Sequence, residues 1–147
     1  MALREQIEQD LKSSLKAGDR VRLSSLRLLW SAIKNEEIEK KENLTDEEIV
    51  TIVQRQVKQR REAAEAYRQA ARDDLAQNEE VELKILSSFL PQQLSEEEIR
   101  KIAEETLNSM PETERINFGK VMGQVMGRVK GKTDGNTVSK VVKELLA

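Results

Sequence analysis

The 147-residue sequence contains no cysteine and no histidine. Their absence excludes thiolate nucleophiles, disulfides and Cys/His zinc sites, and it removes the side chain most often used as a general base near neutral pH. We therefore expect no catalytic residues, no metal and no cofactor. A chain without disulfides also suits a reducing compartment, so we expect a cytoplasmic protein.

Aromatic residues and long apolar runs are also scarce. The only aromatic residues are Trp30, Tyr67, Phe89 and Phe118, which disfavours a single-strand binder that stacks bases on aromatic side chains. No apolar run approaches the length of about 18 residues that a membrane helix needs, and the charged N-terminal residues do not resemble a signal peptide. We expect no membrane association.

The residues that are abundant favour helices. Hydrophobic residues make up 37% and charged residues 35%, with only 6 glycines and 2 prolines. Ala, Glu, Lys, Leu, Arg and Gln dominate, and all of these are good helix formers. The sequence predicts an all-α fold, in which an N-terminal four-helix array or bundle of residues 1–92 precedes a small three-helix C-terminal domain of residues 93–147.

Apolar periodicity and capping residues place the first four helices. Gly18 is expected to end the first helix and Asp19 to cap the second, while Thr45 and Glu48 form a capping box before a long third helix. The predicted ranges are 2–17, 20–41, 45–75 and 79–90. Pro91 disfavours helix at the preceding residue, so we place the domain boundary there.

Three helices are expected after the boundary. Ser95 and Glu98 form a second capping box, and Asn117 is expected to cap the middle helix, with a hydrophobic staple between Ile116 and Val121. Asn136 is expected to cap the last helix.

Three glycines recur every four residues in the middle helix, at positions 119, 123 and 127. Glycine in a helix is destabilising by about 1 kcal/mol relative to alanine, so this stripe needs a reason. Residues 115–147 also carry seven basic and two acidic residues, whereas residues 91–114 carry two basic and seven acidic ones. One interpretation of the stripe and its charge is a nucleic-acid contact made by Lys120, Gly123, Arg128, Lys130, Gly131 and Lys132.

Two interpretations of the glycine stripe stay open on these grounds. Small residues four apart permit a sugar-phosphate backbone to approach, and the amides at the start of the last helix would add a site for an anion. The same residues also permit close packing against the last helix or the N-terminal helices. The acidic residues between 73 and 82 are a third candidate site, but their spacing is typical of helix starts and solvated faces.

Three stretches resemble the GatB/YqeY family. They are DRVRLSSLRLLWSAIKNEEI at 19–38, RREAAEAYRQAARDDLAQNEEVELKILSSFLPQQLSEEEI at 60–99, and FGKVMGQVMGRVKGKTDGNTVSKVVKELL at 118–146. Together they cover most of the chain, which is similar to stand-alone YqeY-like proteins. The last stretch is similar to the tail domain of the GatB subunit of the aspartyl/glutamyl-tRNA amidotransferase.

The resemblance implies an all-helical bundle joined to a tail domain that engages tRNA. It also implies a label of glutamine-dependent carbon–nitrogen ligase, although the domain that performs that chemistry is not part of this sequence. We therefore expect a tRNA-associated accessory protein that is not an enzyme by itself. Its partners would be tRNA and an amidotransferase or aminoacyl-tRNA synthetase complex. The alternative function is that of a protein–protein adaptor or of a component of a glutamine-dependent carbon–nitrogen ligase complex.

Overall fold

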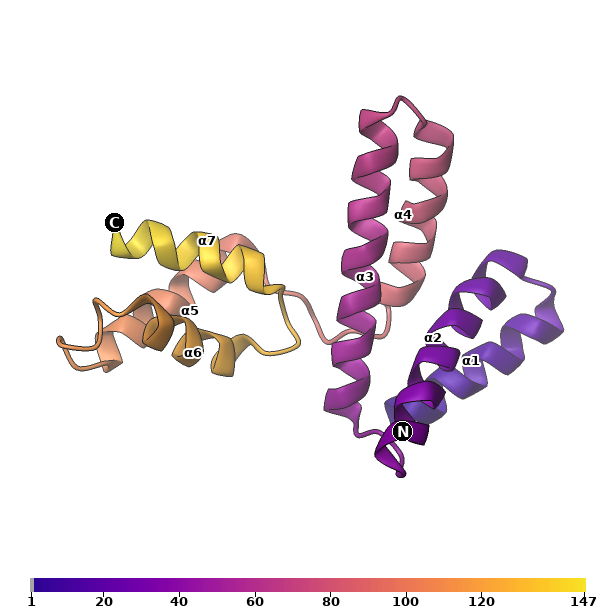
Figure 1. Ribbon diagram of the computed structural model, residues 1–147, viewed down its shortest axis with the longest axis horizontal. Helices are drawn as coiled ribbons and strands as arrows, with labels where there is room; N and C mark the ends of the chain where they lie inside the picture. Colours follow the sequence, from indigo (N-terminus) through magenta and orange to yellow (C-terminus); the bar gives the residue numbers. More distant parts are fainter. Residues whose placement is uncertain (1) are drawn as a thin grey trace. The chain divides into compact units, whose positions relative to one another are not determined.

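The computed structural model describes residues 2–147 and is built from α-helices (Figure 1). Within this range there are seven helices and no β-strand, which confirms the all-α prediction. The helices are α1 (Leu3–Ala17), α2 (Arg20–Lys40), α3 (Asp46–Gln69), α4 (Asp73–Ser87), α5 (Glu96–Ser109), α6 (Phe118–Val129) and α7 (Gly135–Leu146). Their contacts divide the chain into two compact units, Met1–Leu90 and Pro91–Ala147, and each is described by itself.

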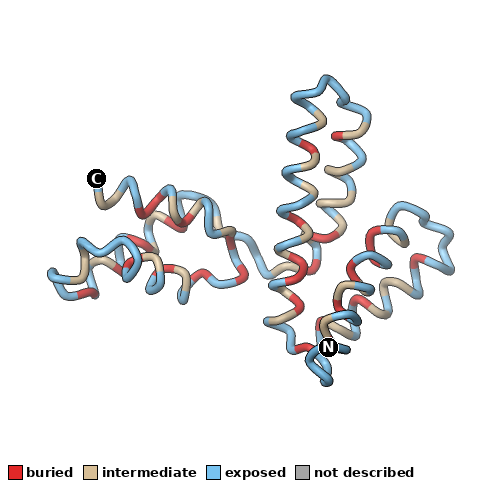
Figure 2. Tube along the Cα trace, viewed as in Figure 1, coloured by how far each residue is buried: buried red, intermediate tan, exposed pale blue. Residues whose placement is uncertain are grey.

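The first unit consists of two helical hairpins, α1–α2 and α3–α4, which share one hydrophobic core (Figure 1). Buried residues recur along the helices of this unit at helical spacing (Figure 2). Every helix of the unit contributes to the core, whose buried members are Leu3, Ile7, Leu26, Leu29, Ile33, Leu44, Ile49, Ile52, Val53, Val57, Leu86 and Phe89.

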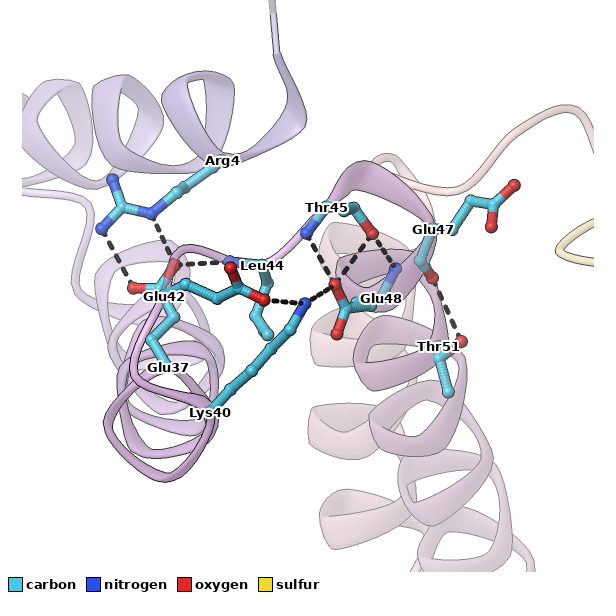
Figure 3. Close-up of polar contacts among 9 residues, drawn as sticks. All are labelled: Arg4, Glu37, Lys40, Glu42, Leu44, Thr45, Glu47, Glu48 and Thr51. Carbon is cyan, nitrogen blue, oxygen red and sulfur yellow. Dashed lines mark hydrogen bonds and ion pairs between the residues drawn. The ribbon is translucent and has the colours of Figure 1, made fainter.

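Local capping sets the helix ends of this unit where the sequence predicts them. Gly18 ends α1 with a left-handed φ of 70°, and the Asp19 side chain accepts a hydrogen bond from the backbone N–H of Arg22. Thr45 and Glu48 form both halves of the predicted capping box at the start of α3 (Figure 3). Because these side-chain caps span only four residues, local sequence is enough to predict them.

A buried carboxylate joins α1, α2 and the segment before α3 (Figure 3). Glu37 is only 7% exposed, and it accepts two hydrogen bonds from the Arg4 guanidinium and one from the backbone N–H of Leu44. The Arg4 hydrogen bonds are the main reason that the pKa of Glu37 falls from 4.5 to about 2. The N-terminal helix is thereby tied to the second hairpin through a charge-assisted contact.

The boundary between α3 and α4 differs from the prediction. The third helix ends at Gln69 instead of near residue 75, and α4 begins at Asp73 instead of residue 79 and ends at Ser87. The break is short because Ala71 adopts a left-handed φ of 57°, which reverses the chain at once. Asp73 lies in the first turn of α4, where a carboxylate is favoured by the helix dipole.

The second unit packs α5, α6 and α7 around a core rich in valine. The core is formed by Ile99, Ala103, Met110, Val121, Val125, Val129, Val138, Val141 and Val142. The capping box of Ser95 and Glu98 and the Asn117 cap are as predicted. The Ile116–Val121 staple is wrong, because Ile116 is 85% exposed.

The cap of the last helix is also not the predicted one. Asp134, two residues before Asn136, is the N-cap, and its carboxylate accepts hydrogen bonds from the Thr137 backbone N–H at 2.8 Å and from the Thr137 hydroxyl at 3.0 Å. Both residue types are good N-caps, so local preference does not separate them. The helix therefore starts earlier than predicted, at Gly135.

Candidate nucleic-acid interface

The face of α6 opposite its buried valines is open. Val121, Val125 and Val129 are fully buried, while the three glycines, each two residues before one of these valines, are exposed. A Cβ atom built on Gly123 or Gly127 meets no heavy atom within 4 Å, and one on Gly119 meets only the Asn117 side-chain oxygen at 3.4 Å. Packing against α5 or α7 within the second unit therefore does not explain the glycines, and the interpretation of the stripe as a packing surface for the last helix is not supported.

Basic side chains of α6 lie beside this stripe. At 100° per residue the glycines span an arc of about 80° on α6, and Lys120 lies next to it. The Lys120 side chain is 58% exposed, and among residues 2–147 it has one long contact, 3.7 Å to Glu114. Arg128 is exposed as well, and its guanidinium lies 3.4 Å from the Ser109 hydroxyl at the end of α5.

The turn after α6 is held in place by the segment that precedes α5. The Gln93 side-chain amide donates to the carbonyl of Gly131 at 3.1 Å, and the Leu94 backbone N–H donates to the carbonyl of Lys132 at 2.8 Å. Lys130 and Lys132 are both exposed on this turn. Two exposed cations are thus carried by backbone that is fixed by hydrogen bonds.

Gly131 has a different role from the other predicted contact residues. It is buried and adopts a left-handed φ of 80°, a conformation that favours glycine. It shapes the turn that presents the two lysines, and it has no exposed surface to offer a ligand. Of the predicted contact residues, the other five lie on the surface: Lys120, Gly123, Arg128, Lys130 and Lys132.

The start of α7 is not the anion site that the sequence suggested. The Asp134 carboxylate already occupies the N-terminus of the helix as its cap. A phosphate there would meet a negative charge, and the amide of Thr137 would have to leave an acceptor that it already has. The N-terminus of α7 is therefore already capped from within the chain.

The remaining basic residues of the last 33 are used within the unit. Arg115 donates to the carbonyl of Met110 at the end of α5, and Lys140 pairs with Glu96 at 3.3 Å. Lys143 lies over the Phe118 ring at 5.9 Å from its centroid. The positive charge of this region thus divides into cations that hold the three helices together and cations on the α6 surface.

The acidic cluster between 73 and 82 is structural. Arg60 of α3 lies 3.3 Å from both Glu79 and Glu82 of α4, and Arg68 pairs with Glu80 at 2.5 Å. These ion pairs connect the two helices of one hairpin. Across residues 2–147, no group of three or more potential ligands is arranged to hold a metal ion, and no helix is long and apolar enough to cross a membrane.

The fold and this surface define a class of protein: an all-helical chain whose C-terminal unit presents a basic helix with an exposed glycine stripe. Residues 4–146 match the family described as Yqey-like protein. The chain therefore belongs to the YqeY-like family, as the resemblance of its three stretches indicated.

Several curated relatives are similar to this chain and share one name. The protein named "Altered inheritance of mitochondria protein 41, mitochondrial" of Vanderwaltozyma polyspora is 34% identical over 111 residues, which cover 74% of this chain and 60% of the relative. The protein of the same name in Pyrenophora tritici-repentis is 28% identical over 119 residues, 80% of this chain and 65% of the relative. The chain thus spans less than two thirds of these relatives.

The relatives' names contradict the predicted cytoplasmic location. Both are named as mitochondrial proteins, as is a third relative in Eremothecium gossypii that is 32% identical over 57% of this chain and 46% of its own length. The prediction rested on the absence of cysteine. A chain without thiols forms no disulfide in any compartment, so this absence does not distinguish one compartment from another.

Proposed function

We propose that the chain is a tRNA-associated accessory protein that contacts the sugar-phosphate backbone through α6 and the turn that follows it. In this proposal residues 93–147 form a three-helix RNA-binding domain attached to a four-helix domain of residues 1–92. The observation that carries it is the open glycine stripe, where a Cβ atom would meet nothing, bordered by exposed cations.

The two features of this surface act together. The missing side chains at Gly123 and Gly127 let a ribose-phosphate backbone approach the helix backbone closely. Lys120 and Arg128 on α6, with Lys130 and Lys132 on the turn, then neutralise phosphates and release their counterions. These contacts read shape and charge and carry no base sequence information, which suits a protein that recognises the body of a folded RNA.

The choice of tRNA comes from the resemblance of the C-terminal stretch to the tail domain of the amidotransferase subunit. In this proposal the chain binds RNA, and the chemistry belongs to a partner such as an amidotransferase or an aminoacyl-tRNA synthetase complex. The chain would then position tRNA for that partner.

A binding titration tests the proposal. Fluorescently labelled total tRNA is titrated with the wild-type protein and with a triple charge reversal, and binding is followed by fluorescence anisotropy. We expect the triple variant to bind at least about tenfold more weakly, because three phosphate contacts are lost. The three changes are Lys120→Glu, Lys130→Glu and Lys132→Glu.

A matched triple variant controls for net charge. It reverses three other exposed lysines, Lys16, Lys58 and Lys101, and so has the same total charge. We expect it to bind tRNA within about twofold of the wild type, because its three changes lie away from the proposed surface and alter only the overall charge of the protein. Equal weakening by the two triple variants, or no weakening by either, would refute the assignment of the interface.

A protein–protein adaptor is the second candidate, and one observation favours it. Ile116 and Phe118, which precede the glycine stripe, are 85% and 38% exposed, and exposed apolar side chains beside small residues suit a partner helix. The adaptor would act within a ligase complex of the amidotransferase type. Its binding would survive high salt and would weaken when Gly123 becomes leucine, whereas backbone binding of RNA is lost in high salt.

A further inference from the structure

A groove lies in the first unit, on the side of α2 that faces α4. The two hairpins diverge from the α2–α3 connection, so that the N-terminal half of α2 and the middle of α4 form opposite walls (Figure 1). One cavity of about 380 Å³ between these walls is lined by Arg20, Val21, Ser24, Asn78, Val81 and Glu82. A second, of about 150 Å³, reaches down to α3 and also includes Glu82 in its lining.

Apolar side chains are exposed along this groove. Val21 and Leu28 of α2 are 51% and 56% exposed, and Val81 of α4 is 48% exposed. Val21 and Leu28 are seven residues apart and so lie on one side of the helix. An isolated exposed aliphatic residue is ordinary, but three that line adjoining cavities form a surface that apolar side chains of another molecule would cover.

The unpaired charge beside the groove is positive. Arg20 and Arg27 are exposed, and within residues 2–147 neither side chain forms an ion pair or a hydrogen bond. On the opposite wall Glu82 is already paired, at 3.3 Å from Arg60. The carboxylate of Glu82 thus has a partner within the chain, whereas the two arginines are available to pair with acidic residues of another molecule.

The floor of the groove contains a buried polar group without a partner. Ser25 is 3% exposed, lines the smaller cavity, and its hydroxyl has no hydrogen-bond partner in the structure. Buried hydroxyls are nearly always hydrogen-bonded. Gln56 and Gln59 of α3 line the same cavity, so a polar side chain that enters it would find several donors and acceptors.

We propose that this groove binds an acidic amphipathic helix of a partner protein. A third, more open hollow runs along α2 and is lined by residues from Arg20 to Ser31, Arg27 and Leu28 among them. The binding stripe on α2 is therefore about 17 Å or three helical turns long, which sets the length of the docked helix. Apolar residues of the partner cover Val21, Leu28 and Val81, its acidic residues pair with the two arginines, and one polar side chain enters the cavity at Ser25. This site belongs to α2 and α4 and is independent of the proposed RNA surface on α6.

A synthetic peptide of defined pattern tests the site in the full-length protein. The peptide is an alanine-based helix with leucine at i, i+4 and i+7 and a glutamate beside each leucine. It is titrated into isotopically labelled protein, and the amide shifts are followed by NMR. We expect saturable shifts centred on the groove, and binding at least about tenfold weaker for the same peptide with lysine in place of glutamate.

Two pairs of protein variants make the test specific. The double change Arg20→Glu and Arg27→Glu is compared with Lys16→Glu and Lys58→Glu, which reverses the same number of exposed charges elsewhere in the unit. We expect a loss of affinity of at least about tenfold for the first double variant and of less than about twofold for the second.

The apolar contact has its own control on the same helix. Leu28→Ser should weaken peptide binding, while Ile38→Ser, at a residue that is 72% exposed and lines none of these cavities, should leave it unchanged. Absence of binding, shifts that map elsewhere, or equal binding of the lysine peptide would overturn the proposal. Concentration-dependent self-association in sedimentation that Leu28→Ser abolishes would assign the groove to a second copy instead, and would also overturn it.

Discussion

Arg4 and Glu37, 33 residues apart in the sequence, form a two-pronged ion pair between α1 and α2. The Nε and Nη2 atoms of Arg4 lie 2.8 and 3.0 Å from the two carboxylate oxygens of Glu37. The Arg4 guanidinium also lies over the Trp30 ring, 5.1 Å from its centroid. Because the carboxylate is buried, its partners determine whether the charge is tolerated there.

Replacing Glu37 with glutamine should destabilise the first unit. The change leaves Arg4 without its anion and weakens the contact to the Leu44 N–H, so we expect a loss of about 2–3 kcal/mol in the free energy of unfolding. Urea unfolding followed by circular dichroism measures it. The control is Glu36→Gln, at the adjacent residue, which makes a half-exposed pair with Arg55 at 3.3 Å and should change stability by less than about 0.5 kcal/mol.

The same pair predicts a pH dependence of stability. The pKa of Glu37 is lowered from 4.5 to about 2 in the folded protein, so the folded state favours the ionised form. The contribution of Glu37 is therefore fully present above about pH 4.5 and is lost as the pH falls towards 2. The stability difference between wild type and Glu37→Gln should narrow over this window, and a difference that stays constant from pH 7 to pH 2.5 would contradict the assignment.

The capping box at the start of α3 should contribute measurably to stability. Thr45→Ala removes the hydroxyl that accepts the Glu48 backbone N–H, and we expect a loss of about 1 kcal/mol. Thermal unfolding of this variant is compared with Thr51→Ala, an exposed position inside the same helix where alanine is the better helix former. A variant at Thr45 that is as stable as the one at Thr51 would argue against the cap.

Alanine in the glycine stripe should separate stability from binding. A Cβ atom at Gly123 or Gly127 meets no neighbour, so each change to alanine should raise the free energy of unfolding by about 0.5–1 kcal/mol. If an RNA backbone lies against the stripe, the double variant Gly123→Ala and Gly127→Ala should bind tRNA more weakly. A more stable protein with undiminished tRNA affinity would show that the glycines are not needed for the contact.

The salt dependence of tRNA binding gives an independent count of the contacts. The logarithm of the binding constant should fall linearly with the logarithm of salt concentration, with a slope close to the number of phosphates neutralised. Reversing Lys120, Lys130 and Lys132 should make this slope shallower by about 2–3, since each phosphate contact contributes about 1. An unchanged slope would place the phosphate contacts on other residues.

Most of the secondary structure could be predicted because its signals are local. The caps at Asp19, Thr45, Ser95 and Asn117 each require a side chain to reach an amide two or three residues ahead, and each forms as the sequence indicates. Two of the predictions failed where two local solutions compete. Position 134 or 136 could cap the last helix, and the acids at 73 and 74 could end one helix or begin the next.

The sequence by itself determined the all-helical fold, the caps and the position of three glycines on one side of α6, because helical periodicity assigns residues to faces. It did not determine which face would be covered, since that depends on neighbours distant in the chain. Only the tertiary structure decided that the stripe at Gly123 is open and that Gly131 is buried in a turn held by Gln93. It likewise decided that Arg60 is paired across the hairpin while Arg20 has no partner among the described residues, because pairing requires an opposite charge within a few ångströms in space.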